Sequence, residues 1–189
     1  MSATAAGRSL RPRLMPAERE APIHIVAYDP SWPALFEAER TLLTEILRPW
    51  LTGPIEHVGS TAVLGMPAKP VIDIMAGVDS LEASRDAVPP LRELGYHHAP
   101  YRADVMHWFC KPGFSLRTHH LHLVPFRSPL WDERLRFRDC LRSTPAIANE
   151  YSALKYELAE IHRFDREAYT EAKGAFIARV LHTLTGGEP

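Results

Sequence analysis

The feature that most constrains the fold is a run of eight residues, 71–78, with the sequence Val-Ile-Asp-Ile-Met-Ala-Gly-Val. Apart from Asp73 the run is apolar, which is typical of a strand that is buried on both faces. A carboxylate in such a strand is costly to bury unless it is paired or bound to a metal. The sequence therefore predicts a buried strand whose one acid faces a cleft beside a cation, with a structural cap or a salt bridge as the alternative.

The first candidate neighbour of Asp73 is the segment Gly59-Ser60-Thr61, which follows a short predicted strand at 55–58. A strand that ends in Gly-Ser and opens into a helical turn presents free backbone N–H groups and a hydroxyl. Those groups suit a phosphate, although an ordinary turn contains the same residues. Because Asp73 comes in the next predicted strand, we interpret the two features together as one functional site.

A further candidate feature is the alternation of histidine and leucine at 117–123, Arg-Thr-His-His-Leu-His-Leu. In a strand, His120 and His122 lie on one face and the two leucines on the other. Two imidazoles on one face bind a metal or donate to phosphate oxygens, and a polar, solvated sheet face is the alternative. Two ligands do not complete a metal site, so Asp73 or Glu56 would have to join them.

Positive charge is regularly spaced in the region that follows. Arg134, Arg138 and Arg142 are four residues apart, so on a helix they share one face, where like charges repel. A bound anion would explain this spacing, and a surface of salt bridges to neighbouring acids explains it equally well. Lys155 and Lys173 each lie at the edge of an apolar stripe, where most lysines extend to solvent.

The rest of the pattern predicts strands mainly before residue 126 and helices after it. Two apolar stripes at helical spacing, ending at Ile161 and Leu184, support the last two helices. The expected elements are a strand at 23–27, a helix from the N-cap Ser31 to about Arg48, a turn bracketed by Pro49 and Pro54, helical structure from Asp79-Ser80 to Leu94 that is divided at Pro89-Pro90 and ended by Gly95, two or three strands within 96–126, and helices at 129–141, 146–162 and 166–184.

Composition limits the classes of protein to consider. The chain has 189 residues and a formal net charge of -1, so bulk charge gives no strong signal for nucleic acid, and nothing in it sets an oligomeric state. No apolar run is long enough to cross a membrane, and the first residues carry no signal-type apolar core. The two cysteines match no metal or redox spacing, so we expect a cytoplasmic protein. We expect residues 1–21 to form a flexible tail and residues 22–189 a single domain.

The order of these motifs resembles the signature of the GrpB family. That family belongs to the nucleotidyltransferase superfamily and also occurs fused to dephospho-CoA kinase. The likeness covers about residues 23–184. The segments that carry it are 55–61 (Ile-Glu-His-Val-Gly-Ser-Thr), 68–74 (Ala-Lys-Pro-Val-Ile-Asp-Ile), Leu94-Gly95-Tyr96, His120-Leu121-His122, 137–142 (Phe-Arg-Asp-Cys-Leu-Arg) and helical residues from Tyr151 to Phe176.

The resemblance implies an α/β fold of the α+β type: a nucleotidyltransferase-like mixed, partly antiparallel sheet flanked by helices, with a helical C-terminal third. Typical nucleotidyltransferases carry a pair of acids separated by one position, and their acids hold two divalent metals. Here the positions on either side of Asp73 are Val71 and Met75, and the neighbouring strand offers His122 where a carboxylate is expected. One divalent metal, with Mg²⁺ as a candidate, or metal-free phosphate binding are the options that remain.

Two hypotheses about function follow. The first is an enzyme that uses ATP or another nucleoside triphosphate to transfer a nucleotidyl group to a small-molecule acceptor, or to activate that acceptor as its adenylate. The second is a fold that binds a nucleotide or CoA-type ligand without catalysis, because the acid pair is broken. In the first, Asp73, His120 and His122 are the catalytic or metal-binding groups, with Glu56 as a further metal ligand. The expected phosphate-binding residues are Gly59, Ser60, Thr61, Lys69, Arg102, Arg138 and Lys155.

Overall fold

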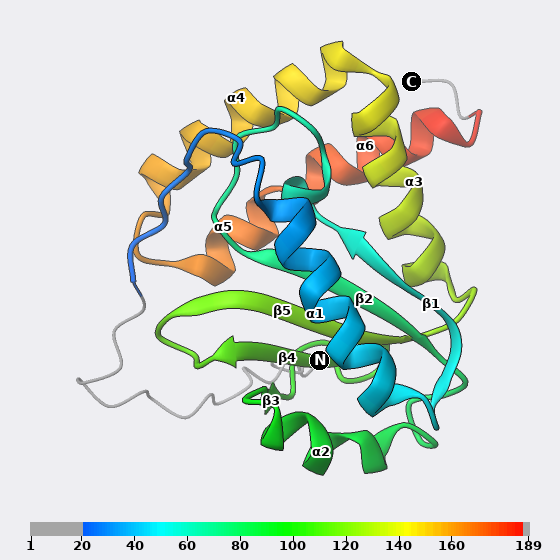
Figure 1. Ribbon diagram of the computed structural model, residues 1–189. Coiled ribbons are helices and arrows are strands. Elements are labelled where there is room, and N and C mark those ends of the chain that lie inside the picture. The colour runs from blue at the N-terminus through cyan, green and yellow to red at the C-terminus, as the bar shows by residue number, and fades with distance from the viewer. Residues whose placement is uncertain (1–20, 187–189) are drawn as a thin grey trace, which may run out of the picture.

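The structure, a computed structural model, describes residues 21–186 and combines a five-stranded sheet with helices on both faces (Figure 1). Most of the expected N-terminal tail, residues 1–20, and residues 187–189 lie outside the described residues. The elements are α1 (Trp32–Leu47), β1 (Leu51–Val58), the 3₁₀ helix η1 (Ser60–Ala62), β2 (Ile72–Val78), the 3₁₀ helix η2 (Arg85–Ala87), α2 (Val88–Glu93), β3 (His97–Ala99), β4 (His107–Pro112), β5 (Arg117–Pro125), α3 (Pro129–Ser143), α4 (Pro145–Ile161), α5 (Arg166–Ala172) and α6 (Gly174–Leu184).

The sheet has the strand order β1-β2-β5-β4-β3 and is mixed. β2 and β5 pair in parallel, and the other neighbours are antiparallel. β2 has a partner on each side, which agrees with its nearly continuous apolar sequence. In this register Asp73 is opposite Val58 of β1 and His120 of β5. The acid therefore lies between the strand end that leads into Gly59 and the strand that carries the two histidines.

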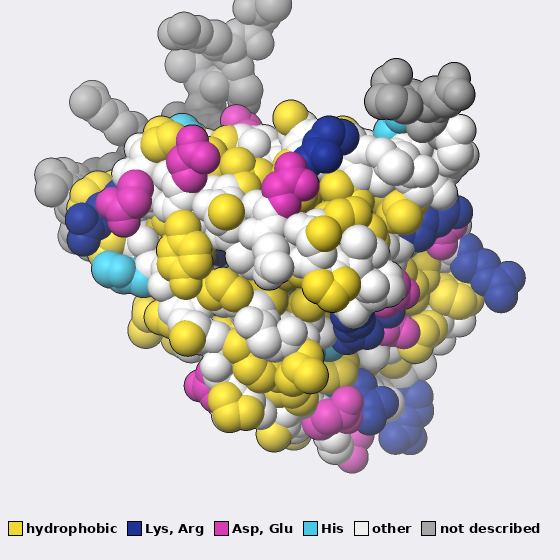
Figure 2. All heavy atoms as spheres, turned by 90° about the horizontal axis from the view of Figure 1, so that it is seen from above, with side chains coloured by type: hydrophobic (Ala, Val, Ile, Leu, Met, Phe, Trp, Pro, Cys, Tyr) yellow, Lys and Arg dark blue, Asp and Glu magenta, His cyan; other side chains and the backbone are white. Residues whose placement is uncertain are grey.

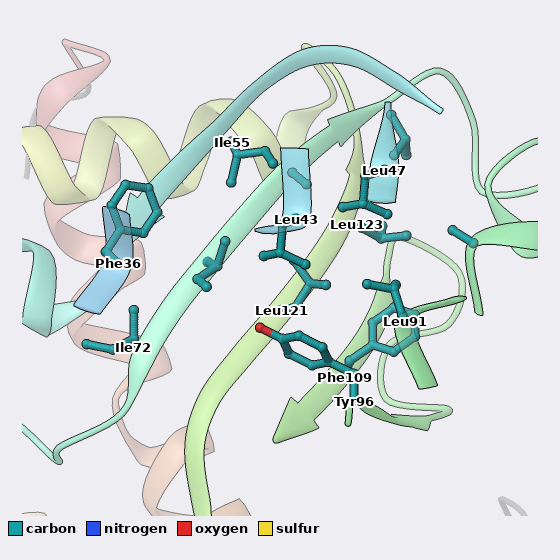
Figure 3. Packing of buried hydrophobic residues seen from close by; sticks show 14 of the residues in the cluster. Phe36, Leu43, Leu47, Ile55, Ile72, Leu91, Tyr96, Phe109, Leu121 and Leu123 are labelled. Carbon is teal, nitrogen blue, oxygen red and sulfur yellow. The ribbon is translucent and has the colours of Figure 1, made fainter. Parts of the chain in front are cut away.

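One face of the sheet is covered by α1 and α2 over a large apolar core (Figure 3). Ile72 of β2 and Leu121 of β5 point to this face and are buried. They pack with Leu43 and Leu47 of α1 and with Leu91 of α2, all of which are fully buried. Because each buried side chain of this size stabilises the fold by about 1.5–3 kcal/mol, this face is a major source of folding free energy.

The opposite face has an apolar part and a polar part. In the apolar part, Met75 of β2 packs with Trp108 of β4 and with Trp131 of α3. The end of α3 then packs with α4 and α6 in a separate cluster that includes Tyr151. The polar part begins at Asp73, which lies two residues before Met75 on the same face of β2. This part contains the candidate site.

A buried carboxylate fastens α1 to the covered face. Glu39 is 6% exposed and accepts hydrogen bonds from Lys111, at 2.7 Å to each oxygen, and from the Tyr96 hydroxyl at 3.0 Å. His119 lies 4.0 Å from the same carboxylate. Burial, together with the charge of Glu39, raises the pKa of Tyr96 far above its usual value, so the hydroxyl remains a donor. The carboxylate and the ammonium are thus paired, as buried charges normally are.

The fold class predicted from the sequence is confirmed: the sheet is mixed, helices flank it, and the C-terminal region is helical. The helix expected from residue 31 and the buried strand expected at 71–78 are α1 and β2. None of the helices within residues 21–186 is long and apolar enough to span a bilayer.

One expectation near the start of the chain is wrong, and a second holds for the position of the residue but not for its hydrogen bond. The strand predicted at 23–27 is reduced to a single bridge between Val26 and Ala68, because Ile23 packs on the C-terminal helices instead of joining the sheet. Ser31 occupies the N-cap position of α1, but its side chain makes no capping bond. Its backbone N–H is bonded to a carboxylate two residues earlier instead.

One proline departs from the predicted pattern and a pair of prolines follows it. Pro54 does not close a turn but lies within β1, where the register with β2 shifts. An edge strand tolerates the missing N–H of proline. Pro89-Pro90 divide the helical stretch as predicted, because η2 ends at Ala87 and the two prolines lie in the first turn of α2, where proline fits.

The helix predicted at 166–184 is two helices, α5 and α6, that meet at Lys173. Gly174 opens the second one, and glycine favours a helix about 1 kcal/mol less than alanine does. The apolar stripes are also shorter than predicted, because Ile161 and Leu184 are 63% and 49% exposed.

Candidate functional site

The candidate site is centred on Asp73, near the start of β2. Its partner on β1 is Val58, so the chain turns at Gly59 directly beside the carboxylate. Gly59 has a φ of +71°, and a Cβ at this position would overlap the Asp73 carboxylate. Glycine therefore meets both the conformational and the steric requirement, which lets the backbone approach the acid closely. The Asp73 side chain is 28% exposed, so a ligand can reach it.

His120 is the direct partner of Asp73. Its Nδ1 lies 2.9 Å from Asp73 Oδ1. An ionised carboxylate only accepts hydrogen bonds, so Nδ1 carries the proton and donates it. In the neutral ring Nε2 then bears a lone pair, and this buried atom has no hydrogen-bond partner among residues 21–186.

His122 lies on the same strand face and is oriented by its other nitrogen. Its Nδ1 lies 3.3 Å from the sulfur of Met106, a weak acceptor, which places the proton on Nδ1. Its Nε2 therefore bears the lone pair, is buried without a hydrogen-bond partner in the described part of the chain, and lies 4.0 Å from Asp73 Oδ1. Two electron-rich atoms face each other across a gap that a cation or a proton donor would fill.

Burial keeps both imidazoles neutral. It lowers the pKa of His122 to about 3, and the charge of Arg134 adds to this shift. Burial also lowers the pKa of His120, against the opposing effect of Asp73. For Asp73 itself burial acts to raise the pKa, but the hydrogen bond donated by His120 is the largest opposing effect, and the pKa lies well below its usual value. At neutral pH the group is an ionised acid beside two neutral rings.

Two lysines add positive charge to the site. The Nζ atoms of Lys69 and Lys173 lie 4.7 Å and 4.2 Å from the centre of the buried Tyr169 ring. Burial lowers the pKa of Lys173 to about 7, the charge of Lys69 adds to the shift, and Asp73 opposes it. Because Lys173 is the residue at which α5 ends and α6 begins, the helix break positions its amine here.

A third cation comes from α3. Burial lowers the pKa of Arg134, Asp73 opposes that shift, and the charge of Arg102 adds to it. The Nε atom of Arg134 is buried and has no hydrogen-bond partner within residues 21–186. Arg102 is exposed and has a φ of 48° in the loop before β4. Arg134 is thus a cation of α3 that acts on the Asp73 group, and the exposed Arg102 acts on Arg134.

The residues that follow Gly59 are held by their neighbours. The Ser60 side chain lies close enough to Tyr151 of α4 to oppose the rise in the pKa of that tyrosine caused by burial. Thr61 is buried, lies 3.0 Å from His57 Nε2 and donates to the carbonyl of Val71 at 3.1 Å. Ser60 therefore belongs to the side of the loop near Asp73, whereas Thr61 connects β1 to the start of β2.

Three other predicted phosphate or metal ligands hold the fold together. Lys155 is 2% exposed, and its amine donates to the carbonyl of Pro67. Arg138 donates to Glu56 at 2.6 Å and to a backbone carbonyl of β1 at 3.1 Å, which fastens α3 to β1. Glu56 consequently lies outside the group of Asp73 and the two histidines. Arg142 donates to the carbonyl of Ala62 and braces the same loop.

Two cavities lie near this loop, with volumes of about 400 and 650 Å³. They share Pro33, Ala62 and Arg142, and Asp73 lines neither of them. The face seen from above α4 shows charges of both signs among hydrophobic side chains (Figure 2). The excess of positive charge is therefore a local property of the Asp73 group and not of that face.

The structure brings Asp73, His120 and His122 together, with Gly59, Ser60 and Lys69 beside them. No site role was expected for Lys173, Tyr151 or Tyr169, and for Arg134 a bound anion and a surface of salt bridges were equal alternatives. Arg134 and Lys173 were visible as a helical repeat and as a lysine beside an apolar stripe. The two tyrosines occupy core positions of amphipathic helices, and nothing in their spacing distinguishes them from packing residues.

The donor set of this group suits one metal ion. Within residues 21–186, Asp73, His120 and His122 are the one group of this type, with a ligand atom from each within 4.8 Å of the others. A second acid is lacking at the flanking positions, where Val71 and Met75 are buried. The residues present therefore do not fit two-metal chemistry.

Fold and site together define a mixed α+β protein with one acid and two neutral imidazoles among cations. The family model described as GrpB protein matches residues 22–183, and the chain belongs to the GrpB family.

Individual relatives agree with that assignment. The chain is 35% identical to glutamate-rich protein GrpB of Alkalihalophilus pseudofirmus, over 85% of this chain and 94% of that protein. A crystal structure of conserved protein GrpB from Enterococcus faecalis is similar with a TM-score of 0.74 and 33% identity, over 83% of this chain and 94% of that chain. The chain is also 30% identical to dephospho-CoA kinase of Mycolicibacterium paratuberculosis, over 81% of this chain and 44% of that protein.

Proposed function

We propose that this GrpB protein binds ATP or another nucleoside triphosphate at Asp73 and transfers the nucleotidyl group to a small-molecule acceptor, or activates that acceptor as its adenylate. The observation that carries the proposal is the excess of cations around one partly exposed acid. Lys69, Lys173 and Arg134 all act electrostatically on the Asp73 group. A site of this kind is stabilised by a ligand with several negative charges.

A triphosphate matches the distribution of these groups. The turn at Gly59-Ser60 presents backbone N–H groups of the kind that cradle phosphate oxygens. Arg134 offers a buried Nε donor without a hydrogen-bond partner in the described chain. Burial lowers the pKa of the Lys173 amine to about 7, and an added anion would favour its charged form. Each of these three elements gains an interaction when phosphate binds.

The proposed reaction is a displacement at the α-phosphorus. A lone pair on an acceptor oxygen forms the new bond to phosphorus, and the bond from phosphorus to the bridging oxygen breaks, so that pyrophosphate leaves with the electron pair. A carboxylate acceptor brings no proton, whereas a hydroxyl acceptor releases its proton to solvent through the Asp73–His120 pair. Lys69, Lys173 and Arg134 stabilise the charge that moves onto the pyrophosphate. A divalent ion at Asp73 would supply further neutralisation of the phosphates.

A second function is favoured by one specific observation. Met75 is fully buried in the apolar part of the sheet face, so the position that would carry the second acid is used for packing. This favours a module that binds a nucleotide without turnover. The match to part of a protein named dephospho-CoA kinase adds a CoA-type molecule to the ligands worth testing.

Calorimetric titration with ATP, GTP and CoA, in the presence of EDTA and then of a divalent ion, tests both functions. We expect ATP to bind and the Arg134→Met variant to bind at least about tenfold more weakly, since one charge-assisted hydrogen bond contributes about 1.5–3 kcal/mol. Arg136→Met is the matched control, because Arg136 is an exposed arginine of the same helix.

Release of pyrophosphate separates the enzyme from the binding module. Turnover with any of a panel of carboxylate and hydroxyl acceptors supports the transferase. Binding without turnover across that panel supports the module. An absence of binding heat with every nucleotide would contradict both.

A further inference from the structure

We infer that Asp73, His120 and His122 bind a single transition-metal ion of the zinc type, and that an oxygen of an anionic ligand completes its coordination. The ion site stands on geometry alone, whereas the role of the anion rests on the proposed function. We therefore infer an ion that prefers imidazole ligands, whereas the sequence suggested Mg²⁺ as the candidate.

The spacing of the three side chains fits one ion. Asp73 Oδ1 lies 2.9 Å from His120 Nδ1 and 4.0 Å from His122 Nε2, and a ligand atom from each residue lies within 4.8 Å of the others. An ion bound to His120 Nδ1 would displace the proton that this atom donates to Asp73, because metal binding releases protons from its ligands. A tetrahedral ion with bonds of about 2.1 Å separates its ligands by about 3.4 Å. Small side-chain rotations are enough to reach that value, because all three residues project from two adjacent, hydrogen-bonded strands.

The orientation of His122 is an independent indication of a ligand. Its side chain is 5% exposed, and Met106 fixes the ring through Nδ1. The unpartnered Nε2 points toward the Asp73 carboxylate, although both atoms are acceptors. Leaving a buried acceptor unsatisfied destabilises the folded protein. A cation between the two atoms removes that cost, and outer-sphere contacts of the kind made by Met106 commonly orient metal-binding histidines.

The donor atoms select the type of ion. Two neutral imidazoles and one carboxylate are typical ligands of Zn²⁺, Fe²⁺ or Co²⁺. Mg²⁺ prefers oxygen ligands in an octahedral arrangement and retains several waters. Three protein ligands also leave a fourth position open, which distinguishes sites that bind a ligand from closed structural sites.

The neighbouring cations couple the ion to an anion. Lys173 Nζ lies 4.2 Å from the centre of the Tyr169 ring, and Arg134 Nε is buried without a hydrogen-bond partner among residues 21–186. The charge of Asp73 acts on both cations, so adding a divalent ion increases the local positive charge. An anion that occupies the open position balances this charge. Each of the two ligands should therefore raise the affinity for the other, by the same factor, because such coupling is reciprocal.

Calorimetric titration of the nucleotide-free protein with Zn²⁺, and separately with Mg²⁺, tests the ion site. We expect one Zn²⁺ per chain, bound at least about 100-fold more tightly than Mg²⁺. His122→Gln and Asp73→Asn should each weaken Zn²⁺ binding by about 100-fold or more, beyond the 10- to 100-fold typical of outer-sphere changes. His97→Gln is the control, because His97 is an exposed histidine of β3.

A spectroscopic measurement distinguishes loss of the ion site from unfolding of a variant. Co²⁺ in a tetrahedral site with nitrogen ligands absorbs visible light, so Co²⁺ added to the wild type should give a band that Zn²⁺ abolishes. Circular dichroism on the same samples shows whether each variant is folded. A folded His122→Gln variant that binds Zn²⁺ as the wild type does, or a wild type that prefers Mg²⁺, would overturn the inference.

The coupling is tested by repeating the Zn²⁺ titration with sulfate. Tighter Zn²⁺ binding supports an anion at the open position, and an unchanged affinity overturns that part of the inference. Zinc titration without nucleotide and ATP titration in EDTA are separate experiments. Failure of the ion site is therefore distinguishable from failure of the proposed function.

Discussion

Two carboxylates on opposite faces of the same sheet have very different surroundings. Glu39, on the face covered by α1, accepts three hydrogen bonds of 2.7–3.0 Å from Lys111 and Tyr96. Asp73, on the other face, accepts one at 2.9 Å from His120. Near Asp73 two imidazole nitrogens and an arginine nitrogen are buried without hydrogen-bond partners among residues 21–186. The first acid is satisfied by the protein, and the second is not.

The difference separates a structural ion pair from a site that needs a ligand. Around Glu39 the positive and negative charges balance, so the pair is complete when the protein folds. Around Asp73 the protein keeps cations and acceptor nitrogens in place at a cost to stability. Groups of this kind are typical of functional sites, where activity is retained at the expense of stability. Removing a group from each site should therefore have opposite consequences.

The largest effect is expected at the Glu39 pair. Lys111→Met leaves a buried carboxylate without its cation and should lower the free energy of unfolding by about 3–5 kcal/mol. Urea unfolding followed by circular dichroism measures this. A decrease in the free energy of unfolding of less than about 1 kcal/mol would contradict the proposed difference between the surroundings of the two acids.

The next effect is expected at the turn beside Asp73. Gly59→Ala places a Cβ against the carboxylate at a φ of +71°, and it should cost about 1–3 kcal/mol of stability and abolish Zn²⁺ binding. Gly65→Ala is the matched control, since Gly65 has a φ of +76° and a Cβ there meets nothing within 4 Å. Equal stability of the two variants would show that the close approach at Gly59 is unimportant.

A smaller effect is expected from the pH dependence of stability. Burial lowers the pKa of Lys155 to about 7, below its unfolded value of 10.5. The unfolded chain therefore binds more protons between these values, and stability should rise as pH increases from about 7 toward 10. The melting temperature should rise by a few degrees between pH 7 and 9 in the wild type and less in Lys155→Met. The same rise in both proteins would mean that another group titrates.

The smallest effect is expected from removal of a cation near Asp73. The free energy of unfolding should change in the opposite direction. Arg134→Met removes a buried, incompletely bonded guanidinium and should change the free energy of unfolding by less than about 1 kcal/mol, toward higher stability. Urea unfolding beside Arg136→Met measures it. Destabilisation of the size expected for Lys111→Met would make Arg134 a structural residue.

The sequence predicts the centre of this site because strand periodicity is strict. Alternation puts His120 and His122 on one face, and the apolar run around Asp73 identifies a central strand. The α+β fold class was predictable from the same signals and from the resemblance to GrpB proteins. These features depend only on neighbours along a strand, which a sequence displays directly.

The cations were harder to predict because they depend on packing between distant elements. Arg134 and Arg138 have the same helical spacing, but Arg138 meets Glu56 of β1 while Arg134 reaches the Asp73 group. Lys173 joins the site only because the last helix breaks there. The sequence displays the residues, but it does not show which partner the fold brings to each.

The most direct test of the contrast is to measure ATP affinity and stability on the same samples of wild type and Arg134→Met. We predict that ATP binds the wild type, and that the variant binds it at least about tenfold more weakly while unfolding at the same or a higher urea concentration. Equal ATP affinity in the two proteins, or no ATP binding by the wild type, would contradict the claim that the Asp73 face is a site for a polyanionic ligand.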